Sequence, residues 1–320
     1  MSAANAYPEV LTPVRKPSFF TRLIRNIKKH PIAYVMSLMV LTYYIIFHYG
    51  AMWGLVIAFQ RFSPRLGIFG SQWVGLDNFR AFINSRSFPG VVFNTLIINF
   101  YQLIFLFPAP IIFALLLNEL RHLRFKKVVQ TISYMPYFIS TMVLSGMIID
   151  FSMSRTGLFN DIIALLGGER TSLLTRPELF RGIYVGSSIW QELGYASIIF
   201  VASLTNIDQE LYEAAAIDGA SRWKQTLHIT LPGITPVIII MLILRMGRMM
   251  TLGFEKIILL YQPATYEVAD VISSFVYRRG FLEADFGFGA SVDMFNSVVN
   301  FSLMLIANYI SRKFSETSLF

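Results

Sequence analysis

The chain has 320 residues, of which 55% are hydrophobic and only 14% are charged, and its mean hydropathy is +0.56. A soluble domain carries charge on about a quarter of its residues, and the apolar residues here are gathered in long runs, so the composition indicates a polytopic membrane protein. The net charge of +8 does not indicate a nucleic-acid partner, because the basic residues cluster beside those runs. The sequence has no cysteine and only scattered histidines, so it predicts neither a disulfide nor a metal site.

The first 31 residues are predicted to form a tail with a basic amphipathic helix. Residues 1–17 show no periodicity and are expected to lack regular structure. From Ser18 the apolar residues follow one helical stripe, arginines and lysines lie largely off it, and Pro31 ends it. Such a helix is typical of a segment that lies on the anionic cytoplasmic face of a membrane.

Six apolar runs are then long enough to cross a bilayer at ~1.5 Å per residue. Pro108 and Pro110 predict a kink in the second run, and Pro136 interrupts the third. The fold class is therefore all-α with about six transmembrane helices. The predicted spans cover about residues 32–59, 91–117, 128–149, 183–204, 233–252 and 289–310, with an extracytoplasmic loop at 60–90 and a cytoplasmic tail at 313–320.

Basic residues set the predicted orientation. They are concentrated in the N-terminal segment and in the short loop 121–127, which fall on the same side of a six-span protein. Short basic segments stay in the cytoplasm. Both termini and the segment between the fourth and fifth spans are therefore expected to be cytoplasmic, in a bacterial inner or plasma membrane.

The segment between spans four and five, residues 206–232, is polar although it lies between two membrane segments. Asn206 or Asp208 can cap a helix through three alanines, and Gly219 tolerates the positive φ that ends such a helix. Ser221 can cap a second short helix that Pro232 is expected to close. The pattern predicts a helix–glycine–helix elbow, hereafter the elbow, with one apolar and one charged edge.

The elbow resembles a motif of the permeases of ATP-driven (ABC) importers. Glu213-Ala214-Ala215, then three residues and Gly219, then nine residues and Ile229-Thr230-Leu231-Pro232, match the Glu-Ala-Ala loop of that family. The resemblance implies a type I importer permease whose core covers residues 91–312. It also implies that Glu213, Ala214, Ala215, Asp218, Gly219, Leu231 and Pro232 contact a cytoplasmic ATPase dimer.

The same resemblance implies a second, often non-identical, permease and an extracytoplasmic solute-binding protein. The chain has no Walker A sequence, since Gly167-Gly168-Glu169-Arg170-Thr171-Ser172 lacks the lysine. It is therefore expected not to be an enzyme and to hold no cofactor, with ATP and Mg²⁺ bound by the ATPase subunits.

Other segments resemble the oligosaccharide branch of these permeases. They are Val74-Gly75-Leu76-Asp77-Asn78-Phe79, Tyr134-Met135-Pro136-Tyr137-Phe138-Ile139-Ser140, Gly253-Phe254-Glu255-Lys256-Ile257, Ala269-Asp270-Val271-Ile272 and Ala307-Asn308-Tyr309-Ile310-Ser311-Arg312-Lys313. The loop before the sixth span combines tyrosines with Arg278 and Arg279, which suits either interfacial anchoring or docking of a binding protein.

Charged residues inside the spans are costly and therefore either functional or paired. Arg245 and Arg248 lie three apart on the fifth predicted span, and Glu192 lies at a comparable depth on the fourth. Either the two spans enclose a wet cavity in which arginines meet sugar hydroxyls or carboxylates, or an Arg–Glu pair ties them together. The predicted substrate path comprises Arg245, Arg248, Glu192, Trp190, Gln191, Tyr195 and Asp293.

The sequence thus favours a permease subunit of an ABC importer for an oligosaccharide or polysaccharide fragment, and a surplus arginine would suit an anionic, uronate-type cargo. One alternative is a type I importer of amino acids, peptides or polyamines. A less favoured alternative is an ion-coupled secondary transporter, which would have no use for the elbow.

Overall fold

The computed structural model describes the backbone of residues 19–314 and the side chains of residues 24–313, so the tail predicted to be irregular, residues 1–17, lies outside it. Helices dominate the described range, which confirms the all-α class. Its strands, β1 (Gln60–Arg61) and β2 (Gln72–Trp73), pair antiparallel with Gln60 opposite Trp73. The chain divides into two units, one through Leu55 and one from Val56 onward.

The first unit contains the basic helix and most of the first span. Helix α1 (Phe19–Lys29) ends before Pro31, which begins the next helix, a position where the missing N–H of proline costs nothing. One helix then runs from Pro31 to Phe59. Its segments are α2 (Pro31–Tyr44), η1 (Ile45–Tyr49), α3 (Gly50–Met52) and η2 (Trp53–Phe59).

The second unit holds the remaining helices. In chain order they are α4 (Gly67–Gly70), α5 (Asp77–Ile83), α6 (Phe88–Tyr101), η3 (Gln102–Leu106), α7 (Pro108–Asn118), α8 (Leu123–Tyr134), η4 (Met135–Phe138), α9 (Thr141–Ser152), α10 (Leu158–Leu165), η5 (Leu173–Thr175), α11 (Pro177–Leu204), α12 (Gln209–Ile217), α13 (Arg222–Gln225), η6 (Thr226–Thr230), α14 (Leu231–Met246), α15 (Phe254–Leu260), η7 (Pro263–Thr265), α16 (Tyr266–Ala269), α17 (Ile272–Val276), η8 (Tyr277–Leu282) and α18 (Phe286–Phe314).

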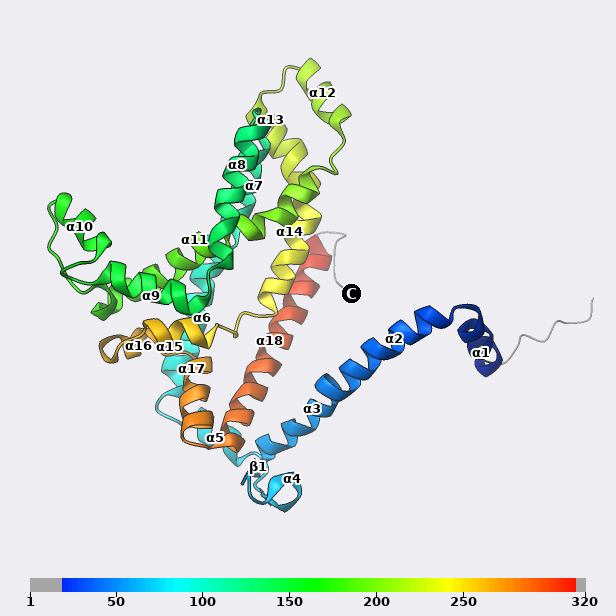
Figure 1. Ribbon diagram of the computed structural model, residues 1–320, viewed down its shortest axis with the longest axis vertical. Helices are drawn as coiled ribbons and strands as arrows, with labels where there is room; N and C mark the ends of the chain where they lie inside the picture. The colour runs from blue at the N-terminus through cyan, green and yellow to red at the C-terminus, as the bar shows by residue number, and fades with distance from the viewer. Residues whose placement is uncertain (1–18, 315–320) are drawn as a thin grey trace, which may run out of the picture. The chain divides into compact units, whose positions relative to one another are not determined.

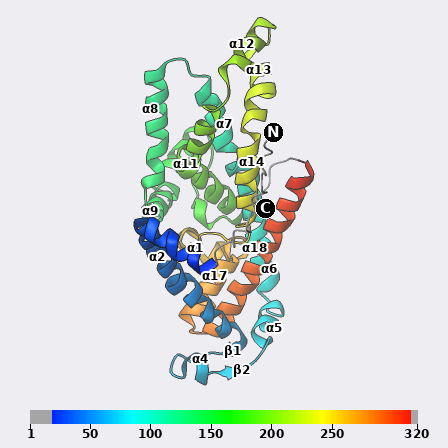
Figure 2. The same ribbon diagram turned by 90° about the vertical axis from the view of Figure 1, so that its right-hand side faces the viewer.

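Helix α11 is central to this unit, because it packs against α7, α8, η3, α14 and α16 (Figure 1). Its N-terminal half contributes Phe180 and Tyr184 to a core shared with α15, and its C-terminal half contributes Phe200 to a core shared with α7 and α14. Helices α12 and α13 project at one end of the unit, and the β1–β2 ribbon and α5 lie at the opposite end (Figures 1 and 2). These ends are called the elbow end and the ribbon end below.

Four helices of the described range are long and apolar enough to cross a membrane: Pro31–Phe59, Phe88–Asn118, Arg222–Met246 and Phe286–Lys313. A bent pair, Leu123–Phe138 with Thr141–Ser152, would make a fifth. Helix α11 has 28 residues but is not among them, and it carries the charged and polar residues Glu192 and Gln191. It occupies the fourth of the six predicted positions.

The third predicted span is not one straight helix. Helices α8 and α9 meet at 96°, with Pro136 in the short 3-10 helix between them. The hydroxyl of Ser140 accepts a hydrogen bond from the Val143 backbone N–H and so begins a new helix. The interruption at Pro136 is thus present, but the chain also changes direction there.

Two prolines are accommodated by local widening of a helix. The kink expected near Pro108 is a π-helical turn over Gln102–Leu106, immediately before that proline. A second π-helical turn, Thr226–Thr230, precedes Pro232. Because the wider turn absorbs the missing N–H and the ring, the helix continues from Arg222 to Met246. The expectation that Pro232 closes the second helix of the elbow is therefore wrong.

The fifth span also ends earlier than predicted. Helix α14 stops at Met246 rather than near residue 252, and a hydrogen-bonded turn follows. Arg248 therefore lies in this turn, where its backbone N–H donates to the Arg245 carbonyl at 3.0 Å, and not on the face of the helix.

Candidate functional site

The elbow is a turn fixed by local hydrogen bonds. The carboxylate of Asp208 accepts from the Glu210 N–H at 3.0 Å and caps α12, and the hydroxyl of Ser221 caps α13. Gly219 between the helices has φ of +74°, a conformation in which a β-branched residue is strained. A 2.9 Å contact between the hydroxyls of Tyr212 and Thr230 ties the elbow to the start of the next span.

The elbow leaves a mixed apolar and charged surface open. Ile217 is 87% exposed and Trp223 is 71% exposed, and both lie in or beside short, capped helices. Glu213 and Asp218 are also exposed, and neither takes part in an ion pair within the described residues. Large exposed side chains on a rigid projecting turn are typical of a contact surface for another protein.

A charged cavity lies between α7, α11 and α14. Its volume is about 340 Å³, and its lining includes Glu192, Arg245 and Arg248 from the predicted path. Arg248 is exposed, whereas Arg245 and Glu192 are half-buried. The structure thus brings three of the predicted path residues into one cavity.

Arg245 does not form an ion pair with Glu192, which was one of the two alternatives for these residues. Its guanidinium donates instead to the side-chain oxygen of Gln102, in the π-helical turn before α7. In the part of the chain that the structure describes, the carboxylate of Glu192 has no basic group within 4.0 Å. The interpretation of Arg245 and Glu192 as a direct tie between spans four and five is therefore corrected.

The other predicted path residues lie elsewhere. Trp190 lines a separate apolar cavity, and Asp293 lines one near the N-terminus of α18. Gln191 donates to the Ile139 carbonyl at 3.0 Å, and Tyr195 stacks on Tyr137 with ring centroids 3.8 Å apart. Gln191 and Tyr195 thus hold the corner between α8 and α9 against α11.

Sequence reasoning missed two partners of this region. Gln102 is one, and its only sequence signal is a polar residue within an apolar run beside a proline. Lys256 is the other: its ammonium is buried, donates to the Ser188 hydroxyl at 2.8 Å and lies 5.0 Å from the centre of the Tyr184 ring. In the sequence, Lys256 is marked only by its place in the family-like segment 253–257.

An ion pair also orders the loop before α18. Arg278 donates to both carboxylate oxygens of Asp270, at 2.9 and 2.6 Å, and Asp270 accepts a further bond from the Ser274 hydroxyl. The hydrogen bonds that Arg278 donates to Asp270 raise the pKa of Arg278 above its ordinary value. Of the two arginines noted in this loop, Arg278 is therefore held in place by its own chain.

A bundle of long apolar helices with a charged cavity in its interior is the architecture of a membrane transport protein. The family described as "Binding-protein-dependent transport system inner membrane component" matches residues 85–316, and the chain belongs to this family.

Individual relatives agree with that assignment. The chain is 39% identical to the polygalacturonan/rhamnogalacturonan transport system permease protein YteP of Bacillus subtilis over the full length of both chains. It is 41% identical to Protein LplB of the same organism over 92% of each chain. A chain in the crystal structure of a bacterial alginate ABC transporter, in complex with an alginate pentasaccharide-bound periplasmic protein, matches with a TM-score of 0.86 and 40% identity. That match covers 93% of this chain and 100% of the other.

Proposed function

We propose that this chain is the membrane-spanning permease subunit of an ATP-driven importer and that its cargo is an acidic oligosaccharide. The observation that carries the proposal is the cavity between α7, α11 and α14, where Arg248 is exposed and Arg245 is held by the neutral Gln102. Two cations thus face one carboxylate there. A cavity with a surplus of positive charge suits a cargo that carries carboxylates.

The relatives support the same cargo class. One is a permease protein for polygalacturonan and rhamnogalacturonan, and a second solved relative, 41% identical with a TM-score of 0.84, is described as involved in the import of the acidic polysaccharide alginate. The named polymers contain uronic acids, whose carboxylates the arginine side chains can bind in bidentate fashion.

The elbow supports a cytoplasmic ATPase partner. Its exposed apolar residues Ile217 and Trp223 lie beside the carboxylates of Glu213 and Asp218, on a turn that α14 connects directly to the cavity. We assign ATP and Mg²⁺ to a dimer of separate ATPase subunits, whose closure would move the elbow and α14 together. The chain itself then catalyses no reaction.

The remaining partners follow from this assignment. The short basic segments favour a cytoplasmic location for the elbow end and both termini. The ribbon end would then face outward, toward a solute-binding protein. A second, homologous permease completes the path, as the family resemblance implies, beside the cavity that Arg248 lines with an exposed side chain.

Transport by the whole assembly tests the proposal. The chain would be purified with its partner subunits, reconstituted in vesicles, and supplied with its binding protein and either an acidic oligosaccharide or a neutral one of the same length. Losing a charge-assisted hydrogen bond costs ~1.5–3 kcal/mol, so Arg248→Ala is expected to raise the half-saturation concentration for the acidic cargo about tenfold or more.

The neutral cargo should be much less affected. Arg170→Ala is the matched control, because Arg170 is a partly exposed arginine paired with Asp161 away from the cavity. Equal losses for acidic and neutral cargo would contradict an anionic cargo, and ATP-independent uptake by this chain alone would contradict an ATP-driven permease.

A further inference from the structure

A second cavity lies next to the charged one, nearer the N-terminus of α11. Its volume is about 550 Å³, and it is bounded by Tyr101 and Phe105 on one side and by the N-terminal half of α11 on the other. Arg181 and Glu178 are its charged lining residues. None of the residues predicted for the path belongs to it.

The two cavities follow one another along the same face of α11. Val185 and Ile189 line the second cavity, and Glu192 and Ala196 line the first. These positions are separated by four, three and four residues, so they form one stripe on a helix. The opposite walls of both cavities include residues of one π-helical turn, because Phe105 lines one cavity and Leu106 lines the other.

Arg181 is held at the edge of the second cavity by neutral partners. Its guanidinium donates to the side-chain oxygen of Asn94 at 2.8 Å and to the Val268 carbonyl at 3.4 Å, and it lies 5.7 Å from the centre of the Phe93 ring. No carboxylate lies within 4.0 Å of Arg181 in the described part of the chain. Its charge is therefore held in position without a direct ion pair.

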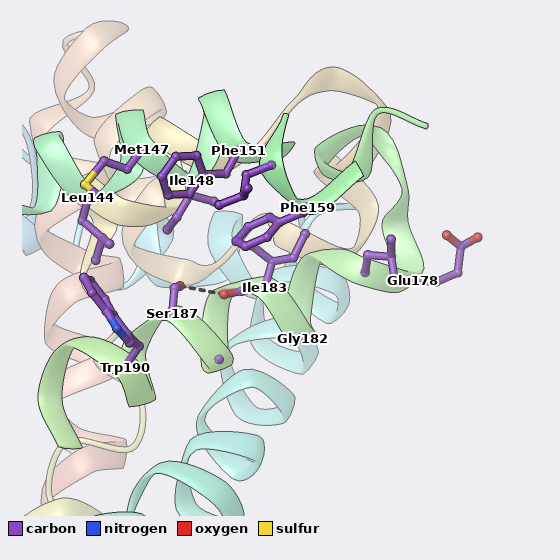
Figure 3. Close-up of a pocket in the computed structure, with 13 residues that line it drawn as sticks. Leu144, Met147, Ile148, Phe151, Phe159, Glu178, Gly182, Ile183, Ser187 and Trp190 are labelled. Carbon is purple, nitrogen blue, oxygen red and sulfur yellow. Dashed lines mark hydrogen bonds between the residues drawn. The ribbon is translucent and has the colours of Figure 1, made fainter. Parts of the chain in front are cut away.

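The cavity on the other flank of α11 is apolar and serves as a comparison. The cavity in Figure 3 has a volume of about 670 Å³ and is lined mainly by apolar side chains of α9, α10 and α11, among them Ile148, Phe151 and Phe159. Glu178 lies at its edge with the carboxylate directed away from these rings (Figure 3). A surface with no arginine suits lipid, whereas the flank that carries Arg181 suits water and a charged ligand.

Tyr101 and Phe105 give the second cavity an aromatic wall. Their ring centroids are 6.5 Å apart. Phe105 is 56% exposed and makes no other ring contact within the described residues. An exposed ring beside a fixed cation matches the two chemistries of a uronate unit, an apolar C–H face and a carboxylate.

We propose that the second cavity is a separate subsite for one uronate unit of the cargo, in which Arg181 binds the carboxylate and Phe105 packs against the sugar face. The inference rests on the proposed function, because it requires an acidic oligosaccharide as cargo. Arg181 and Glu192 are eleven residues apart, or about 16 Å at the helical rise. Only a chain of several sugar units can span both cavities. The subsite should therefore contribute to the binding of long cargo and not of short cargo.

Uptake as a function of cargo length tests the subsite. The reconstituted assembly with its binding protein would be supplied with a digalacturonate or a hexagalacturonate, and the variants would be Arg181→Gln and Phe105→Ala. Arg181→Gln is expected to raise the half-saturation concentration for the hexamer about tenfold and for the dimer less than about twofold. Phe105→Ala should give the same pattern with a smaller change.

Phe159→Ala is the matched control, because it removes an aromatic ring from the cavity on the other flank of α11. It should leave the half-saturation concentrations for the dimer and the hexamer unchanged. If Arg181→Gln does not assemble, Phe105→Ala decides the question, since its exposed ring is not part of a core cluster. If the variants lose affinity equally for dimer and hexamer, or lose none, the subsite is overturned. In that case, uptake of both cargoes by the wild-type assembly still supports the proposed function. Failure of the wild-type assembly to import either would overturn both.

Discussion

Gly194 is the point at which α11 touches the backbone of α8. A Cβ atom added there would lie 2.0 Å from the Ser133 carbonyl oxygen and 2.9 Å from the Tyr134 nitrogen. Cβ atoms essentially never approach within 3.0 Å of another heavy atom, so the helices would have to separate by about 1 Å, the difference between 3.0 and 2.0 Å. Backbone atoms within a helix cannot move aside individually. Gly194→Ala should therefore open the corner between α8 and α9.

The magnitude follows from what that separation disturbs. Overpacking costs ~1–3 kcal/mol, the Gln191 bond to the Ile139 carbonyl contributes ~1 kcal/mol, and the Tyr137–Tyr195 stack contributes ~1 kcal/mol. The higher helix propensity of alanine offsets ~1 kcal/mol of this. We expect a net loss of about 2–4 kcal/mol in stability.

Thermal melting of the purified protein in detergent measures this loss. The signal is the fraction of protein that stays monodisperse after heating to each temperature. Gly146→Ala on α9 is the matched control, because a Cβ at Gly146 would have no heavy atom within 4 Å. Gly194→Ala should melt several degrees below wild type, and Gly146→Ala at or above it. If the two variants melt together, the contact between α11 and α8 is not as close as the structure shows.

Three further predictions concern the elbow, the orientation and the ion pair in the loop before α18. Gly219→Val places a β-branched residue at φ of +74° and should leave the bundle assembled but release or uncouple the ATPase; co-purification and transport at the wild-type rate would contradict this. A cysteine in place of Asn84, which is exposed in the segment after α5, should react with a membrane-impermeant thiol reagent in spheroplasts. A cysteine in place of Arg124 on α8 should react only after permeabilisation, and the reverse pattern would contradict the orientation. Asp270→Asn should lower the melting temperature because it leaves Arg278 without its carboxylate, whereas Asp285→Asn should change it little, since its 4.0 Å contact with Arg279 is partly exposed.

Local rules predicted the features that depend on a few neighbouring residues. The caps at Asp208 and Ser221 and the positive φ at Gly219 follow from side-chain chemistry and backbone sterics within a turn. The membrane class and the approximate positions of the long apolar helices follow from composition. These inferences needed no knowledge of tertiary contacts.

Features that depend on distant contacts could not be predicted in this way. Pro136 indicates a break, but the 96° angle depends on how α9 packs on α15 and on the bond from Gln191 to Ile139. Pro232 indicates a helix end, yet a π-helical turn before it lets the helix continue. Trp190 shares α11 with Glu192 but lines another cavity, and Asp293, on α18, lines a third, which the spacing along the chain did not reveal.

The partner of Arg245 is the clearest case, and it leads to a final prediction. Charge alone favoured Glu192, but the π-helical turn over Gln102–Leu106 directs Gln102 to the guanidinium instead. An arginine without a partner in the membrane costs ~2.5–3.5 kcal/mol, so Gln102→Leu should lower the melting temperature and the yield of assembled protein. Glu192→Gln should change them much less, and Gln102→Leu combined with Arg245→Met should recover most of the loss because no buried charge remains. If Glu192→Gln is as damaging as Gln102→Leu, then the carboxylate, and not the amide, holds Arg245 in the membrane.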